Sequence, residues 1–146
     1  MMTPKMNRII GDYPKFIGDV VAKWCDINHR DMRLVEPFSF IDRSGVKWTA
    51  PKRALINGAS IPRIFWTFVS SPFCGHYRRA SVIHDYYCRY KQRSSKAVHL
   101  MFYEAMLQDG VPKAKAKILY TAVAWFGPKW TNKVSRDRKL PWKNLF

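Results

Sequence analysis

The second half of the chain carries an apolar periodicity that suits α-helices, and this limits the fold more than any other feature. Apolar residues recur every three or four positions in three successive blocks, which is the spacing of one helix face. Serine favours a helix start, Gly110 favours a helix end, and Pro112 suits a first turn. These signals predict three helices, over about 77–93, from Ser94 or Ser95 to Gly110, and from Pro112 to Gly127.

Each predicted helix has a stripe of residues expected to face the core. The stripes are Ala80, Ile83, Tyr87 and Tyr90 in the first helix, Val98, Met101, Phe102, Ala105 and Met106 in the second, and Ile118, Ala122 and Trp125 in the third.

The first half of the chain has the pattern of β-strands and loops. Residues 38–41 and 46–49 flank a glycine-bearing turn, which predicts a hairpin. Residues 16–24 form a weaker strand candidate, and residues 57–63 read as a turn.

The order of these elements predicts an α+β fold, with a small antiparallel β region packed on a three-helix C-terminal half. We expect one domain over residues 1–128, β-rich over 1–69 and helical over 72–128, followed by a basic, aromatic tail over 129–146.

The net charge of +16 is distributed unevenly along the 146 residues. Residues 1–42 hold six basic and six acidic side chains, so the whole surplus belongs to residues 43–146. Such a surplus favours a polyanionic partner: nucleic acid, anionic lipid or an acidic protein surface. The residues expected to bind it are Lys113, Lys115, Lys117, Lys129, Lys133, Arg136, Arg138 and Lys139.

Cysteine use and hydropathy indicate a chain that is made in the cytoplasm. Three cysteines without a CxxC motif do not form a disulfide framework. No stretch approaches the roughly 18 apolar residues of a membrane span, and the N-terminus lacks the apolar core of a signal peptide. We therefore expect no transmembrane segment.

His84 and Asp85 are adjacent within the first predicted helix, so their side chains diverge by about 100° and serve different partners. One can then act as a base and the other as a ligand, as a hydrolytic site requires. Cys88 lies one helical turn after His84, and His99 is expected opposite on the second helix. Because imidazole and thiolate both suit zinc, His84, Cys88 and His99 form an alternative zinc constellation.

Several motifs follow one another between residues 38 and 130. They are Gly58-Ala59-Ser60-Ile61-Pro62-Arg63, His84-Asp85-Tyr86, Glu104-Ala105-Met106 and Tyr120-Thr121-Ala122-Val123. In this order they resemble a domain-of-unknown-function family that is common in tailed phages and prophages. The resemblance implies a phage setting and no particular reaction.

The first two predicted helices also resemble, more weakly, the paired helices of phospholipase A₂. That resemblance implies that His84 is a general base, that Asp85 ligates calcium together with carbonyls of the loop before the helix, and that a residue of the second helix orients the histidine. His99 stands at this last position, where the resembled families have aspartate. His84, Asp85 and His99 are thus the expected catalytic residues.

Together these features predict a phage-encoded protein of the virion or tail that acts at the host envelope or within the particle. It would be made in the host cytoplasm and could assemble as a homo-oligomer or with an acidic phage subunit. Two alternatives stay open. One is an active lipid or ester hydrolase that serves as a toxin or lysis aid, and the other is a non-catalytic adaptor that binds DNA or an acidic subunit.

Overall fold

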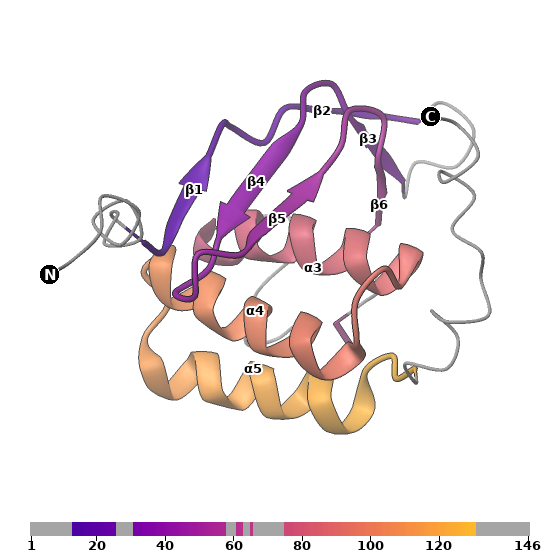
Figure 1. Ribbon diagram of the computed structural model, residues 1–146. Helices are drawn as coiled ribbons and strands as arrows, with labels where there is room; N and C mark the ends of the chain where they lie inside the picture. The colour runs from indigo at the N-terminus through magenta and orange to yellow at the C-terminus, as the bar shows by residue number, and fades with distance from the viewer. Residues whose placement is uncertain (1–12, 26–30, 58–60, 63–64, 66–74, 131–146) are drawn as a thin grey trace, which may run out of the picture.

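A computed structural model describes residues 13–25, 31–57, 61–62, 65 and 75–130 of the chain. Small antiparallel sheets occupy the N-terminal half and three helices the C-terminal half (Figure 1). The predicted α+β class is therefore confirmed.

Two three-stranded antiparallel sheets form the β region. The first has the order β1 (Lys15–Ile17), β4 (Phe38–Ile41) and β5 (Lys47–Ala50). The second has the order β2 (Ala22–Trp24), β3 (Met32–Leu34) and β6 (Leu55–Ile56). The single strand expected over 16–24 was wrong, because its two ends belong to different sheets. Gly18 lies between them with a φ of +83°, a left-handed conformation that interrupts an extended strand.

The predicted hairpin is confirmed as β4 and β5, with Phe40 opposite Trp48. The buried Asp42 side chain organises its turn. One carboxylate oxygen accepts the backbone N–H groups of Ser44 and Val46, at 2.8 and 3.0 Å. The other accepts the indole N–H of Trp48 at 2.9 Å, so this one carboxylate fixes the turn and the first core residue after it.

The three predicted helices are confirmed as α3 (Arg78–Tyr90), α4 (Ser95–Gln108) and α5 (Lys113–Phe126), and a short 3₁₀ turn, η2 (Gly75–Tyr77), precedes α3. Ser94 is the N-cap of α4, where its hydroxyl accepts the N–H of Ala97. The first helix ends at Tyr90, earlier than expected, because Lys91 adopts the left-handed conformation with a φ of 52°.

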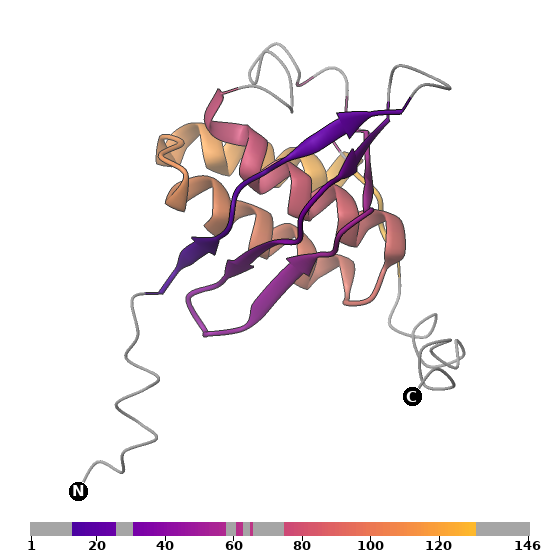
Figure 2. The ribbon, with the colours of Figure 1, turned by 90° about the horizontal axis from the view of Figure 1, so that it is seen from above.

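The helix α3 lies at the centre of the molecule. Strands of both sheets pack on one side of it and α4 packs on the other, while α5 lies beyond α4 (Figures 1 and 2). All nine residues from Ala80 to Cys88 are consequently buried. A helix buried all round has no single core stripe, and Tyr90, expected in the core, is 45% exposed at its end.

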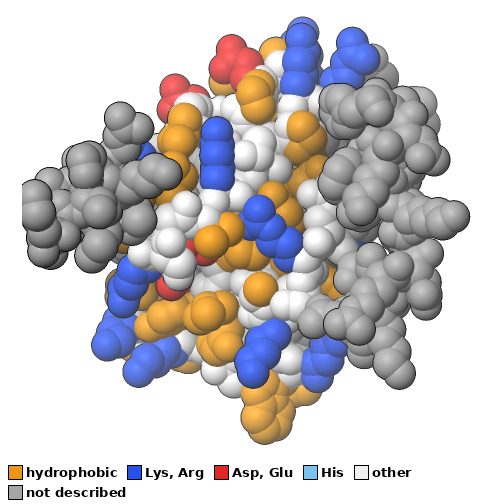
Figure 3. Space-filling view, in the orientation of Figure 1, with side chains coloured by type: hydrophobic (Ala, Val, Ile, Leu, Met, Phe, Trp, Pro, Cys, Tyr) orange, Lys and Arg blue, Asp and Glu red, His pale blue; other side chains and the backbone are white. Residues whose placement is uncertain are grey.

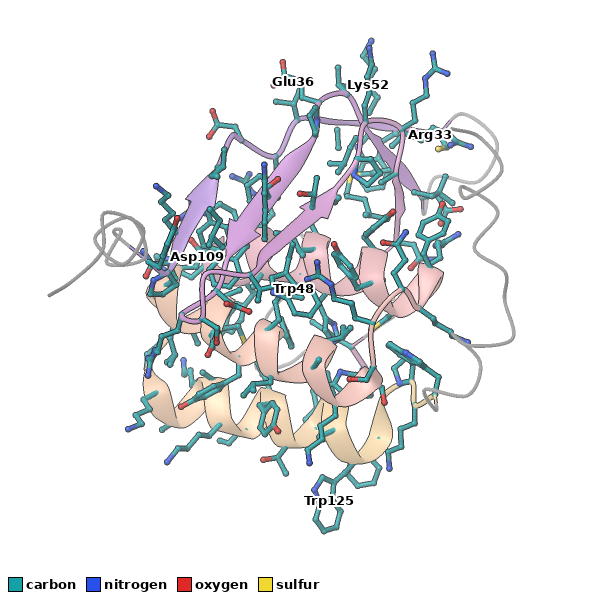
Figure 4. All side chains as sticks on the ribbon, in the orientation of Figure 1. Arg33, Glu36, Trp48, Lys52, Asp109 and Trp125 are labelled. Carbon is teal, nitrogen blue, oxygen red and sulfur yellow. The ribbon has the colours of Figure 1, made fainter. Side chains whose placement is uncertain are left out.

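The core face expected for α5 was wrong. Ile118 is 44% and Trp125 is 70% exposed, and Trp125 points away from the rest of the molecule (Figure 4). Ala122 lies on both the predicted face and the observed one, because both faces follow helical spacing. The buried face consists of Ala116, Leu119, Ala122 and Val123.

In the part of the chain that the structure describes, no helix has both the length and the apolar character needed to cross a membrane. Of the expected tail, only residues 129 and 130 are described.

Candidate functional site

The central position of α3 places His84 inside the protein. The side chain is fully buried, and its ring stacks on Phe102 of α4 with 4.3 Å between the ring centroids. A polar group in such surroundings costs free energy unless it finds a hydrogen-bonding partner.

That partner is His99, which lies opposite on α4. His84 Nε2 and His99 Nδ1 are 2.9 Å apart, and His99 is itself only 3% exposed. The expectation that the two histidines approach within hydrogen-bonding distance is confirmed.

The backbone after α5 determines which nitrogen of His99 carries the proton. His99 Nε2 lies 3.0 Å from the carbonyl oxygen of Pro128, so Nε2–H must donate there. In a neutral ring Nδ1 then carries the lone pair and accepts the Nε2–H of His84. The result is a directed chain of two hydrogen bonds from His84 to His99 to Pro128.

Gly127 permits this arrangement. A Cβ atom at this position would lie 2.5 Å from the carbonyl oxygen of Val123, so a larger residue would displace the backbone that leads to Pro128. The sequence identified Gly127-Pro128 only as a helix end. The role of the Pro128 carbonyl was missed, because a backbone acceptor leaves no signal in side-chain identity.

Cys88 is the third member of the cluster. Its sulfur lies 3.5 Å from Nε2 and 3.9 Å from Nδ1 of His84, one helical turn away. The nitrogen and sulfur atoms that His84, Cys88 and His99 offer lie within 4.8 Å of one another, and all three residues are buried. Among the described residues this is the group of side chains best placed to hold a metal ion.

Burial shifts the protonation equilibria of all three groups toward the neutral form. It lowers the pKa of His84 well below 6.5, and the neighbouring His99 lowers it further. Burial also lowers the pKa of His99, although the hydrogen bond to Pro128 opposes this shift and Lys129 adds to it. The pKa of the Cys88 thiol is raised, chiefly by burial and then by Asp85. The cluster is therefore uncharged at neutral pH.

These shifts predict an acid-sensitive fold. Both histidine pKa values are lower in the folded protein than in the unfolded chain, so the unfolded chain binds more protons below about pH 6.5. The contribution of the two histidines to the free energy of unfolding should be complete above that pH. It should fall as the pH drops toward the pKa values of the folded protein. Urea denaturation between pH 7.5 and 5 measures the effect. A His84→Gln, His99→Gln double variant should flatten this part of the profile, and an unchanged slope would contradict the assignment.

The Asp85 side chain contacts different residues from the His84 side chain. It is 5% exposed, and its Oδ2 accepts the backbone N–H of Asn57 at 2.8 Å. It thereby ties α3 to the segment that follows β6.

The calcium site that the phospholipase resemblance implied stays a prediction. The loop expected to supply carbonyl ligands lies mostly outside the described residues, at 66–74.

A small cavity of about 170 Å³ reaches the cluster from the surface, beside His99. Two of its lining residues are exposed lysines, one from the first turn of α4 and one from the segment after α5. The lining residues are Ser95, Lys96, His99, Tyr120, Ala124 and Lys129.

The expected polyanion-binding residues fall into two groups. Lys113, Lys115 and Lys117 are exposed at the start of α5, and Lys129 is exposed beside the cavity. The others, Lys133, Arg136, Arg138 and Lys139, lie outside the described residues. On the face drawn in Figure 3, lysine and arginine side chains are spread over several elements and do not gather in one patch.

Comparisons with known proteins identify the chain's relatives. It is 49% identical over 117 residues to the uncharacterized protein y4jT of Sinorhizobium fredii (strain NBRC 101917 / NGR234), a match that covers 80% of this chain and 35% of the relative. It is 40% identical over 119 residues to y4iH of the same strain, covering 82% and 49% respectively. The chain thus spans between a third and a half of the length of these relatives.

No solved structure gives a significant match to the chain. The family model described as protein of unknown function (DUF1353) matches residues 32–123, which hold β3 to β6, α3, α4 and most of α5 with the His84, Cys88 and His99 cluster. The chain belongs to the DUF1353 family.

Proposed function

We propose that the chain is a hydrolase of phage origin whose working site is the α3–α4 pair, arranged like the helix pair of phospholipase A₂. The observation that carries this proposal is the hydrogen-bonded chain from His84 through His99 to Pro128. In it, a residue of the second helix fixes the tautomer of a histidine on the first, which is the role of the third group in a base dyad.

The proposed chemistry uses His84 as a general base. With its Nε2–H donated to His99, the lone pair of His84 is on Nδ1. This nitrogen takes a proton from a water molecule while the water oxygen attacks an ester carbonyl carbon. The proton then passes to the leaving alkoxide when the carbon–oxygen bond breaks. Because His99 is a neutral acceptor, it stabilises the charged His84 less than the aspartate of the resembled enzymes would.

The proposed substrate is an ester that carries a negative charge, such as an anionic phospholipid. Lys96 and Lys129 at the cavity beside His99 would attract such a group. Asp85 contributes by holding the segment after β6 against α3, and calcium has no part in the proposed reaction.

We place this activity in the virion or tail of a phage, at the host envelope. The support is the order of motifs between residues 38 and 130 and the basic surplus of the second half. The protein would be made in the host cytoplasm and then packaged, as a homo-oligomer or on an acidic subunit.

The test is hydrolysis by the purified full-length chain on vesicles of phosphatidylcholine with and without phosphatidylglycerol. Release of fatty acid is expected, faster on the anionic vesicles and unaffected by a calcium chelator. If no fatty acid is released from either kind of vesicle, with or without added metal, the result would contradict the hydrolase and favour the non-catalytic adaptor.

The second candidate function is a non-catalytic adaptor that binds a polyanion. The observation that favours it is the start of α5, where Lys113, Lys115 and Lys117 are exposed and no acidic residue occurs in the helix. Like charges four positions apart repel each other and destabilise the helix unless an anion relieves them.

Binding to a polyanion should therefore weaken steeply as salt is added. Titration of double-stranded DNA or of anionic vesicles at several salt concentrations measures the slope of log affinity against log salt. On DNA, replacing all three α5 lysines by glutamine should reduce that slope by about 0.9 for each lost phosphate contact. The matched control replaces Lys23, Lys47 and Lys52 of the β region. An equal change in both variants would mean that the charge serves solubility alone.

A further inference from the structure

We propose that His84, Cys88 and His99 bind a zinc ion through His84 Nε2, Cys88 Sγ and His99 Nδ1. The inference concerns the side chains of the proposed hydrolytic site but does not depend on hydrolysis, because metal binding is measured without a substrate.

The spacing of the three ligand atoms suits a tetrahedral centre. Zinc lies about 2.0–2.1 Å from imidazole nitrogen and about 2.3 Å from thiolate sulfur. A tetrahedron with those bonds separates two nitrogens by roughly 3.3 Å and a nitrogen from a sulfur by roughly 3.6 Å. The observed distances are 2.9 Å between His84 Nε2 and His99 Nδ1, and 3.5 Å between His84 Nε2 and Cys88 Sγ. In these two pairs the atoms need to separate by only a few tenths of an ångström, and all three ligand atoms lie within 4.8 Å of one another.

The ligand atoms come from two helices that pack on each other at the centre of the fold. His84 and Cys88 are one turn apart on α3, and His99 projects from the antiparallel neighbour α4. Stacking on Phe102 fixes the plane of the His84 ring. The two packed helices therefore bring all three ligand atoms together in the folded chain.

The hydrogen bond from His99 Nε2–H to Pro128 independently supports a metal site. Histidines that bind metals commonly donate their other N–H to a backbone carbonyl or carboxylate, which fixes the tautomer and directs the second nitrogen at the ion. Here the nitrogen so directed is Nδ1, and it faces His84 and Cys88.

Zinc binding needs no other reactant, because each proton that it displaces has a place to go. The thiol of Cys88 releases its proton to solvent and bonds to zinc as thiolate. His84 moves its proton from Nε2 to Nδ1, so the ion takes the place of the proton in the bond between the two imidazoles. Three protein ligands leave a fourth position for water, as in catalytic zinc centres.

The test is titration of the full-length, chelator-treated protein with ZnCl₂ by calorimetry and with CoCl₂ by absorption spectroscopy. One zinc ion per chain is expected. Cobalt should give the visible bands of a tetrahedral site and a thiolate-to-cobalt charge-transfer band in the near ultraviolet.

The variants locate the site. Cys88→Ser should abolish the charge-transfer band and weaken zinc binding by more than about 100-fold, since even partners that only orient a ligand are worth 10–100-fold. The matched controls are Cys25→Ser, at a half-buried cysteine outside the cluster, and His76→Ala, at an exposed histidine. Both should bind like the unaltered protein.

Two results would overturn the inference. One is an unaltered, folded protein that takes up no stoichiometric zinc. The other is zinc binding and a charge-transfer band that survive in Cys88→Ser. The first result needs no variant, so it stands even if Cys88→Ser fails to fold.

Discussion

Replacing His84 by glutamine is expected to lower the rate of ester hydrolysis by about 10²–10⁴-fold, the usual cost of removing a general base. Glutamine can still donate an N–H to His99 but has no nitrogen that accepts a proton at neutral pH. The fold should survive, because the hydrogen bond between α3 and α4 is kept. Fatty-acid release from anionic vesicles measures the rate, and urea denaturation checks the fold.

The matched control is His76→Gln, which changes an exposed histidine at the start of the same helical segment. It should hydrolyse at the rate of the unaltered protein. A folded His84→Gln protein with full activity would remove His84 from the reaction and leave it as a core residue.

Zinc is expected to stabilise the folded chain strongly. A ligand that binds only the folded state raises the free energy of unfolding by about 4.1 kcal/mol when its free concentration is 1,000 times its Kd. Denaturation with urea, with and without zinc and under reducing conditions, measures the increase. Cys88→Ser should gain far less, because it loses the thiolate ligand.

The same experiment on Cys25→Ser supplies the control, with an increase equal to that of the unaltered protein. Equal stabilisation of Cys88→Ser and the unaltered chain would place the zinc elsewhere. The proposals of zinc binding and of hydrolysis can be contradicted independently. An active chain that binds no zinc supports only the role of His84 as a base, whereas an inactive chain that binds zinc supports only the metal site.

The sequence was informative about elements whose signals are local. The Ser94 cap, the Gly110 end and the hairpin turn at 42–45 each depend on a few neighbouring residues, and the structure has all of them. The approach of His84 and His99 could also be predicted, because two helices joined by a short turn must run antiparallel.

The sequence was less informative where tertiary packing decides. Residues Ala80 to Cys88 are all buried because α3 has neighbours on both sides, and helical periodicity describes only one buried face. The phase of α5 was misjudged because apolar residues occur on more than one side of this helix: Ile118 and Trp125 are exposed, whereas Leu119 and Val123 are buried.

At the site, the sequence identified the side chains that come together but did not predict which nitrogen of each imidazole carries the proton. The identities of His84, Cys88 and His99 suggested either a base dyad or a zinc site. The choice of tautomer depends on the Pro128 carbonyl, which only the three-dimensional structure brings to His99. One partner of Asp85 is also a backbone group, the N–H of Asn57, which side-chain identity does not reveal.

The protonation of the two imidazoles tests the central claim most directly. Long-range ¹H–¹⁵N correlation spectra of the full-length, metal-free protein at pH 7 distinguish the two neutral tautomers from the charged ring. We expect both histidines to be neutral with the proton on Nε2, and added zinc to move the His84 proton to Nδ1 while His99 keeps its own. A charged ring at pH 7, or a His84 that carries its proton on Nδ1 before any metal is added, would contradict this account of the site.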